Sequence, residues 1–193
     1  MTINITSPIK SREIEELAVG DSVLVSGFIY TARDTAHQRI IEALDKKKEP
    51  PFALKGQTIY YMGPSPAPPG KVIGSAGPTT SRRMDAYTPR LLDAGIKVII
   101  GKGSRSPEVR RALKKHKAVY LAAAGGAGAL LASAITEVEV IAYEDLGPEA
   151  VMRLTVENFP AVVANDIHGG DLFELGRAEY KGRKQDPEDY PTQ

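Results

Sequence analysis

Strand-like and helix-like segments alternate along residues 96–166, and this alternation restricts the possible folds more than any other feature of the sequence. Short apolar runs that end in glycine or polar residues predict strands, and segments with helically spaced apolar side chains lie between them. Such alternation is typical of an α/β layered domain whose strands are mainly parallel. The predicted strands are 96–103, 118–126, 137–147 and 160–166, and the predicted helices are 106–117, 127–135 and 148–159.

The first part of the chain is richer in strands. Alternating β-branched and aromatic residues predict strands at 22–32 and 56–63, with an amphipathic helix at 33–48 between them. The proline-rich segment 64–71 predicts a loop, because proline lacks the backbone N–H that a helix needs. Residues 77–95 begin with Gly-Pro and two threonines and then show helical spacing, which predicts a helix with Thr79 and Thr80 at its start.

Length and composition indicate one soluble domain. The chain has 193 residues, 42% of them hydrophobic, and a net charge of +1, so charge-based recognition must be local. No apolar run approaches the roughly 18 residues of a membrane span, and the N-terminus lacks a signal-peptide core, so we expect a cytoplasmic protein. We expect the domain to cover residues 1–176, followed by a polar tail at 177–193.

The chain has no cysteine. Disulfides and thiolate ligation of a metal or cluster by this chain are therefore excluded. The three histidines are far apart in sequence and match no zinc motif. We therefore expect no metal to be ligated by this chain.

Polar side chains follow three of the predicted strands. In open α/β sheets, ligands bind where the carboxyl ends of strands meet the starts of helices, so these residues are candidates for a common site. The three segments contribute Arg33, Asp34 and His37; Thr79, Thr80, Arg82, Arg83 and Asp85; and Lys102 and Arg105.

The shared character of these segments is cationic. If Arg33, Arg83 and Lys102 converge, two helix N-termini nearby would add N–H donors for the same anion. The alternative is that each of these three side chains is a solvated surface charge with no ligand. Asp34 and Asp85 are expected to orient arginines or cap helices. From the residues alone, the inference ends at a small anion, such as a dicarboxylate or a phosphate ester.

Two other motifs favour structural roles. The glycine-rich segment 122–133 follows a strand, but it lacks the lysine of a P-loop and its glycines do not match the dinucleotide-binding pattern. Close packing of small residues explains it better. The segment 165–176 brings Asp166, His168 and Asp171 together, and turn chemistry with local capping accounts for them.

Three long motifs resemble the β subunit, or C-terminal domain, of class I fumarate hydratases, which are related to the tartrate dehydratase β subunit. They are GDSVLVSGFIYTARDTAH, YYMGPSPAPPGKVIGSAGPTTSRRMD and IIGKGSR, and the resemblance covers roughly residues 10–176. It implies a three-layer β/β/α swivelling domain. In the motif around Asn165–Asp171, asparagine commonly stands in the family where this chain has Gly170.

The resemblance also implies a partner and a cofactor. In the family an α-type subunit holds a 4Fe-4S cluster through three cysteines, and its open iron binds the substrate as a Lewis acid. A cysteine-free chain is what the β-type half of such a hetero-oligomer should be. The implied reaction is the reversible hydration of fumarate to malate in the tricarboxylic acid cycle.

Carried over onto matching positions, the family's roles fall on four residues. Thr79 matches the proposed catalytic base, and Arg33, Arg83 and Lys102 match the contacts to the substrate carboxylates. A threonine base is chemically demanding, because an alkoxide needs nearby cations and N–H donors. Dehydration of tartrate or another 2-hydroxy dicarboxylate, and a non-catalytic anion-binding module, remain as alternatives.

Overall fold

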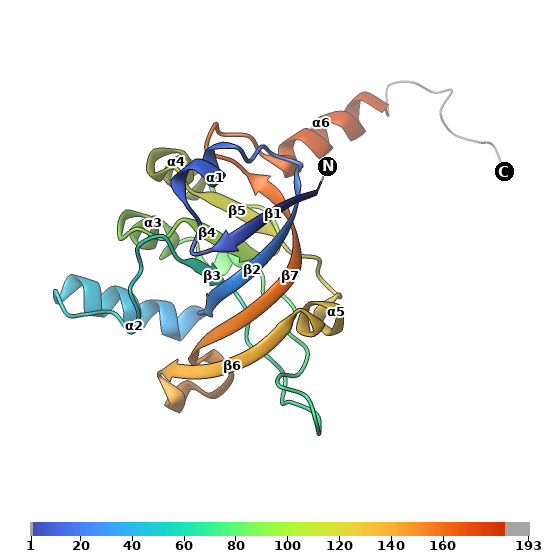
Figure 1. The fold of residues 1–193 in the computed structure, drawn as a ribbon. Coiled ribbons are helices and arrows are strands. Elements are labelled where there is room, and N and C mark those ends of the chain that lie inside the picture. The colour runs from blue at the N-terminus through green and yellow to red at the C-terminus, as the bar shows by residue number, and fades with distance from the viewer. Residues whose placement is uncertain (1, 184–193) are drawn as a thin grey trace.

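The computed structural model describes residues 2–183, which form a mixed α/β domain (Figure 1). Its strands are β1 (Thr2–Ser7), β2 (Ser22–Thr31), β3 (Thr58–Tyr60), β4 (Val98–Gly101), β5 (Val119–Ala122), β6 (Ile135–Ala142) and β7 (Val151–Asn165). Its helices are α1 (Ser11–Glu15), α2 (Asp34–Asp45), α3 (Thr88–Asp93), α4 (Pro107–His116), α5 (Gly128–Ser133) and α6 (Leu172–Arg183), with two 3₁₀ segments, η1 (Ser81–Met84) and η2 (Glu144–Glu149).

Five strands close into a barrel. β2, β3, β4 and β5 are parallel neighbours in that order, and β7 pairs antiparallel with both β5 and β2. β1 lies parallel to the first part of β2, and β6 lies antiparallel to β7. The mixed α/β class and the parallel central strands are thus confirmed, whereas the three-layer arrangement stays a prediction beside this closed ring.

The barrel strands carry two hydrophobic layers, because successive side chains point to opposite faces. Tyr60, Ile100 and Leu121 belong to one buried cluster, which also contains Ile29 and Leu154. Their sequence neighbours Ile59, Ile99 and Tyr120 belong to a second cluster, which packs beneath helices α2, α3 and α4. With one cluster enclosed by the ring and the other under the helices, the parallel strands are buried on both faces.

The predicted helix at 148–159 is wrong, because these residues belong mostly to the long strand β7. Burial alternates along much of β7, as a strand with one buried face requires. The alternation is interrupted at a β-bulge, where the pairing of β7 with β2 shifts register between Val25 and Gly27. Asn158 lies at this bulge, with a φ of 52°, and its N–H donates to Ser26 Oγ at 3.0 Å. β1 was not predicted at all.

The predicted helix at 77–95 is also corrected. It divides into the four-residue η1 and the short helix α3, and Thr79 lies in the loop before η1. Thr80 occupies the N-cap position of η1 without a side-chain capping bond. The second helix N-terminus expected at the site is therefore only a 3₁₀ turn.

The C-terminal segment is partly described. α6 continues through residues 177–183 and projects from the body (Figure 1), so the first part of the predicted tail is helical. The rest of that tail, 184–193, lies outside the described residues, and the domain boundary at 176 stays a prediction.

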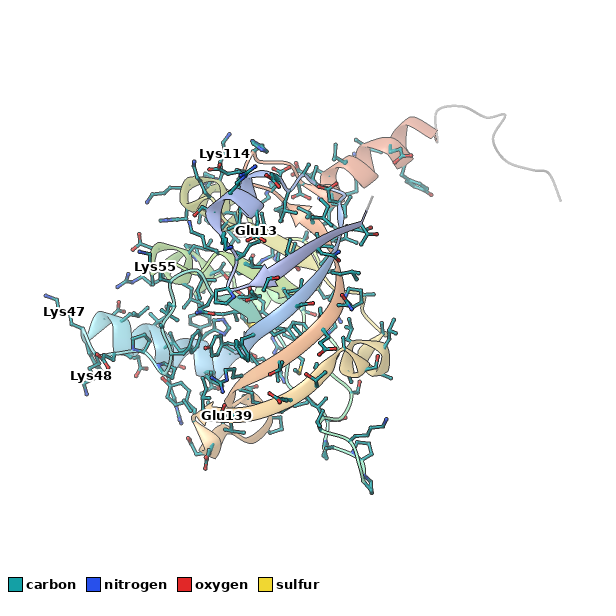
Figure 2. The ribbon with its side chains drawn as sticks, viewed as in Figure 1. Glu13, Lys47, Lys48, Lys55, Lys114 and Glu139 are labelled. Atoms are coloured by element: carbon teal, nitrogen blue, oxygen red, sulfur yellow. The ribbon has the colours of Figure 1, made fainter. Side chains whose placement is uncertain are left out.

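Surface charges of both signs are spread over the molecule. Figure 2 shows Lys47 and Lys48 at the far end of α2 and Glu139 on β6, all directed outward. Within the described part of the chain, no helix has the length and apolar character needed to cross a membrane.

Candidate functional site

The candidate site lies along the carboxyl edge of the parallel strands. Arg33 follows the end of β2, Gly63 follows β3, and Lys102 follows β4. Because β3 pairs with both β2 and β4, these three positions are consecutive along one edge. The structure thus brings the predicted segments to one edge.

Arg33 is largely enclosed, with 22% of its side chain exposed. Its Nη2 lies 3.5 Å from Glu149 Oε1 and 3.9 Å from Asp34 Oδ2, while its Nε is buried without a partner among the described residues. The guanidinium packs against Gly63, where a Cβ atom would lie 2.7 Å from Nη1. Sequence reasoning missed Glu149, which lies in η2, far along the chain.

Arg83 is held by the same carboxylate. Its Nε and Nη2 donate to the two oxygens of Asp34 at 3.1 and 2.5 Å, which is a bidentate contact. Asp34 therefore orients Arg83, which confirms its expected role, and lies at a longer ion-pair distance from Arg33. About half of the Arg83 side chain is exposed, so its outer edge remains accessible to a ligand.

Thr79 is fixed through its backbone. Its N–H donates to the carbonyl of Tyr61 at 2.8 Å, which attaches the loop to the residue after β3. The side chain is half-buried, and within residues 2–183 its hydroxyl has no hydrogen-bond partner. This hydroxyl is therefore free to contact a ligand, whereas Thr80 is exposed.

Lys102 is exposed, but its backbone is fixed. Its N–H donates to Ser81 Oγ at 2.9 Å, and its carbonyl accepts from the Ser81 N–H at 3.0 Å. Residue Thr80 also forms a parallel bridge with Lys102. The aliphatic chain passes close to Gly125, where a Cβ atom would lie 2.8 Å from Cδ. The glycine-rich turn thus gives Lys102 room, and Ser81 was missed as the residue that joins these segments.

Three further candidates lie beneath the site rather than in it. His37 and Arg105 are both buried, and so cannot touch a ligand at the surface. Asp85 accepts from Arg105 Nε at 2.8 Å and from the Ser106 N–H at 2.7 Å, which confirms its orienting and capping role.

Burial lowers the pKa of His37 to about 4, and Arg105 acts in the same direction. The Arg33 carbonyl, which accepts from Nδ1 at 2.7 Å, and the Asp34 carboxylate oppose that shift. His37 is therefore neutral at neutral pH. Its Nε2 has no partner among the described residues, and its ring packs edge-on to Tyr61.

His37 predicts a loss of stability in mild acid. The unfolded chain takes up a proton near pH 6.5, but the folded chain only near pH 4, so the stability held above pH 6.5 falls as the pH drops between these values. The loss amounts to about 3 kcal/mol. Denaturant unfolding at pH 7, 5.5 and 4.5 should show a shallower pH dependence in His37→Asn. A wild-type slope in that variant would contradict the prediction.

Segment 165–176 makes the local turn and capping bonds that the sequence predicts. The Asp166 carboxylate accepts from the N–H groups of Val19, His168 and Gly170, and these bonds lower its pKa against the opposing effect of burial, which is the largest single influence. Asp171 accepts from two N–H groups at the start of α6. A Cβ atom at Gly170 would lie 2.7 Å from Asp166 Oδ2 and 2.8 Å from Val19 Cγ1, so a side chain at this position would require these neighbours to move.

Comparison with known proteins decides the family. A model described as Fumarase C-terminus matches residues 1–176. This chain belongs to the fumarase C-terminus family. The resemblance seen in the sequence motifs is therefore confirmed.

Members of the fumarase C-terminus family differ in length. The chain is 38% identical over 176 residues to "Fumarate hydratase class I, anaerobic" of Escherichia coli (strain K12), and 40% identical over 176 residues to "Fumarate hydratase 1, mitochondrial" of Leishmania major. Each alignment covers 89% of this chain but 32% of the relative. The chain is 41% identical over 169 residues to "Putative L(+)-tartrate dehydratase subunit beta" of Methanocaldococcus jannaschii, with 84% of this chain and 87% of the relative covered.

The chain thus spans about a third of the fumarate hydratases that it matches, and most of the subunit-sized relative. The cluster expected in this family is ligated by cysteine thiolates, and this chain has no cysteine. Among residues 2–183, no three His, Asp or Glu side chains gather into a metal site. The residues present do not fit a cluster as its ligands.

Proposed function

We propose that this chain is the β-type half of a two-chain hydro-lyase that reversibly hydrates fumarate to malate. The observation that carries the proposal is the Thr79 hydroxyl, which has no hydrogen-bond partner in the described part of the chain and which a backbone bond to Tyr61 attaches to the strand edge that also presents Arg33 and Lys102. The family supports it, since its relatives include enzymes named as fumarate hydratases. The subunit-sized relative supports a separate chain.

In this proposal the cations hold the substrate dianion. Arg33 and Arg83, joined by Asp34, bind carboxylate through N–H donors, and Lys102 adds a mobile point charge. Deprotonation of the malate carbon beside a carboxylate places extra negative charge on that carboxylate. Preorganised cations stabilise this charge more in the transition state than in the ground state.

Thr79 removes the carbon-bound proton in the dehydration direction. The acceptor is the Thr79 alkoxide, which becomes the hydroxyl when it takes the proton, and the neighbouring cations lower the cost of forming that alkoxide. The backbone bond to Tyr61 holds the residue in place while the hydroxyl stays free. The chain itself therefore binds and orients the dianion and accepts one proton at Thr79 Oγ1.

The remaining parts of the proposal belong to a partner. The 4Fe-4S cluster and the acid that protonates the leaving hydroxyl are assigned to an α-type chain. We also place the assembled enzyme in the cytoplasm, with a three-layer domain that swivels against its partner.

Dehydration of tartrate is the second candidate. The match to nearly the whole of a protein named as a tartrate dehydratase β subunit favours it. The extra hydroxyl of tartrate is a small difference for a pocket to distinguish. Co-expression with an α-type chain, anaerobic purification and rates with malate and each tartrate isomer test both candidates. No turnover with any of them would contradict the proposal.

The two-chain proposal predicts that this chain alone is inactive and binds no cluster. It has no cysteine to hold one. The purified chain should show no hydratase activity and no cluster absorbance after anaerobic treatment with iron and sulfide. The same treatment of the co-expressed pair is the control. Turnover by the single chain would overturn the division of labour.

A further inference from the structure

Arg105 is a buried cation beneath the candidate site. Its side chain is fully enclosed, and it lies in the loop between Lys102 and helix α4. Burial lowers the pKa of Arg105, but Tyr61, Asp85 and Tyr120 more than offset this and raise it overall, so the guanidinium stays charged. A charge this deep in a core needs specific partners.

Its partners lie on the segments that carry the site. Arg105 Nε donates to Asp85 Oδ1 at 2.8 Å, and Asp85 is the residue directly after η1. Nη2 donates to Thr88 Oγ1 at 2.7 Å, at the start of α3. Asp85 Oδ2 also accepts from the Ser106 N–H. The Arg105 side chain therefore joins η1, through an ion pair, and α3, through a hydrogen bond, to the loop that follows Lys102.

The guanidinium also lies over the rings of two tyrosines. The Arg105 guanidinium carbon lies 5.3 Å from the ring centre of Tyr61 and 4.9 Å from that of Tyr120. Tyr61 holds Thr79 through its carbonyl. The hydroxyl of Tyr120 donates to the Gly103 carbonyl at 2.9 Å and lies 3.1 Å from Ser81 Oγ, so it contacts the residue after Lys102 and the residue that bonds the Lys102 backbone.

Each tyrosine thus connects Arg105 to a residue of the proposed chemistry. The Tyr61 hydroxyl also bonds Thr88 Oγ1 at 2.8 Å, which closes a ring of contacts among Arg105, Thr88 and Tyr61. Ser81, in turn, fixes the backbone of Lys102. The guanidinium therefore contacts the rings of the two residues through which Thr79 and Lys102 are attached.

We propose that Arg105 is a positioning residue that sets the relative placement of Thr79 and Lys102. This inference rests on the proposed function. Arg105 touches no substrate and acts through Tyr61, Tyr120 and Asp85.

The energetics of buried ion pairs indicate that Arg105 positions the site and does not mainly stabilise the fold. Buried ion pairs are costly to desolvate, and replacing both partners by neutral groups is often neutral or stabilising for a fold. Removing only the arginine would instead leave the Asp85 carboxylate without its charge partner. A paired replacement therefore separates the two roles, because it removes the guanidinium without leaving an unpaired charge.

The test is a double-mutant cycle on the co-expressed two-chain enzyme. Arg105→Met with Asp85→Asn removes both charges, and the asparagine oxygen can still accept from the Ser106 N–H. We expect kcat to fall by roughly 100-fold, as for a displaced catalytic group, while the denaturant midpoint stays near that of the wild type. When Thr79→Val is already present, adding Arg105→Met and Asp85→Asn should lower kcat little further, because all three substitutions act on the same step.

Two further variants test whether the guanidinium of Arg105 is needed and whether any arginine on this part of the chain would have the same effect. Arg105→Lys should recover only part of kcat, because an ammonium cannot span Asp85 and Thr88 as the planar guanidinium does. Arg111→Met is the matched control, since Arg111 is exposed on α4 and pairs with Glu108. It should leave kcat unchanged.

The outcomes separate the two proposals. If the wild-type pair is active and the folded Arg105→Met, Asp85→Asn enzyme keeps its kcat, the positioning role is wrong. Fully additive losses with Thr79→Val would also overturn it. An inactive wild-type pair would contradict the proposed function, and this inference with it.

Discussion

Replacing Thr79 by valine is expected to reduce kcat of the two-chain enzyme by roughly 10²- to 10⁴-fold, the usual contribution of a positioned base. Substrate affinity should change little, because the cations supply most of the binding. Valine keeps the branched shape at Cβ and removes the hydroxyl alone. Since Thr79 is fixed by its backbone N–H, the loop should keep its place in the variant.

Two neighbouring changes serve as controls. Thr79→Ser should retain part of the activity, because the hydroxyl remains although its rotamer is less restricted. Thr80→Val should stay close to wild type in kcat and in stability, since Thr80 is exposed and caps no helix through its side chain. This differs from the capping role that the sequence predicts for Thr80, whose loss would cost about 1 kcal/mol.

Exchange of the malate carbon-bound proton with solvent measures the step directly. In the Thr79→Val enzyme this exchange should become slow together with turnover. Exchange at the wild-type rate would mean that Thr79 only binds or packs, and that the base belongs to the partner chain.

The placement of the candidate residues was predictable because their segments follow strands. The parallel order β2, β3, β4 places the residues directly after their carboxyl ends, such as Arg33 and Lys102, on one edge. Thr79 reaches the same edge through the bond from its N–H to the Tyr61 carbonyl. What sequence could not supply was their support. Glu149 reaches Arg33 from η2, and Ser81 pairs with Lys102 across a loop, which are distant contacts that no local pattern encodes.

The closed barrel was not predictable, because its closure also depends on contacts between residues distant in sequence. Its closure depends on β7, whose segment 148–159 carries apolar residues at spacings that a helix also satisfies. Pairing with β2, β5 and β6 decides in favour of a strand, because Val151, Leu154 and Val156 are then buried against partners distant in sequence. Tertiary context overrides local propensity here.

Alanine at Arg33, Arg83 or Lys102 is expected to cost roughly 2–5 kcal/mol in transition-state binding, as for truncation of one partner in a buried charged contact. The loss should be largest at Arg33, which is the most enclosed and whose removal leaves Glu149 facing the dianion. Arg83 lies near the lower end, because half of its side chain is in water. The measurement is kcat/KM of each variant in the two-chain enzyme.

Conservative changes show whether the contact needs a fork or only a charge. Arg33→Lys and Arg83→Lys keep the charge but lose bidentate geometry, so both should remain impaired. Arg82→Ala is the matched control, because Arg82 is an exposed neighbour of Arg83 in η1 and pairs with no carboxylate in the described structure. If Arg33, Arg83 and Lys102 all behaved like Arg82, they would be solvated surface charges, and the convergence of cations on one dianion would be refuted.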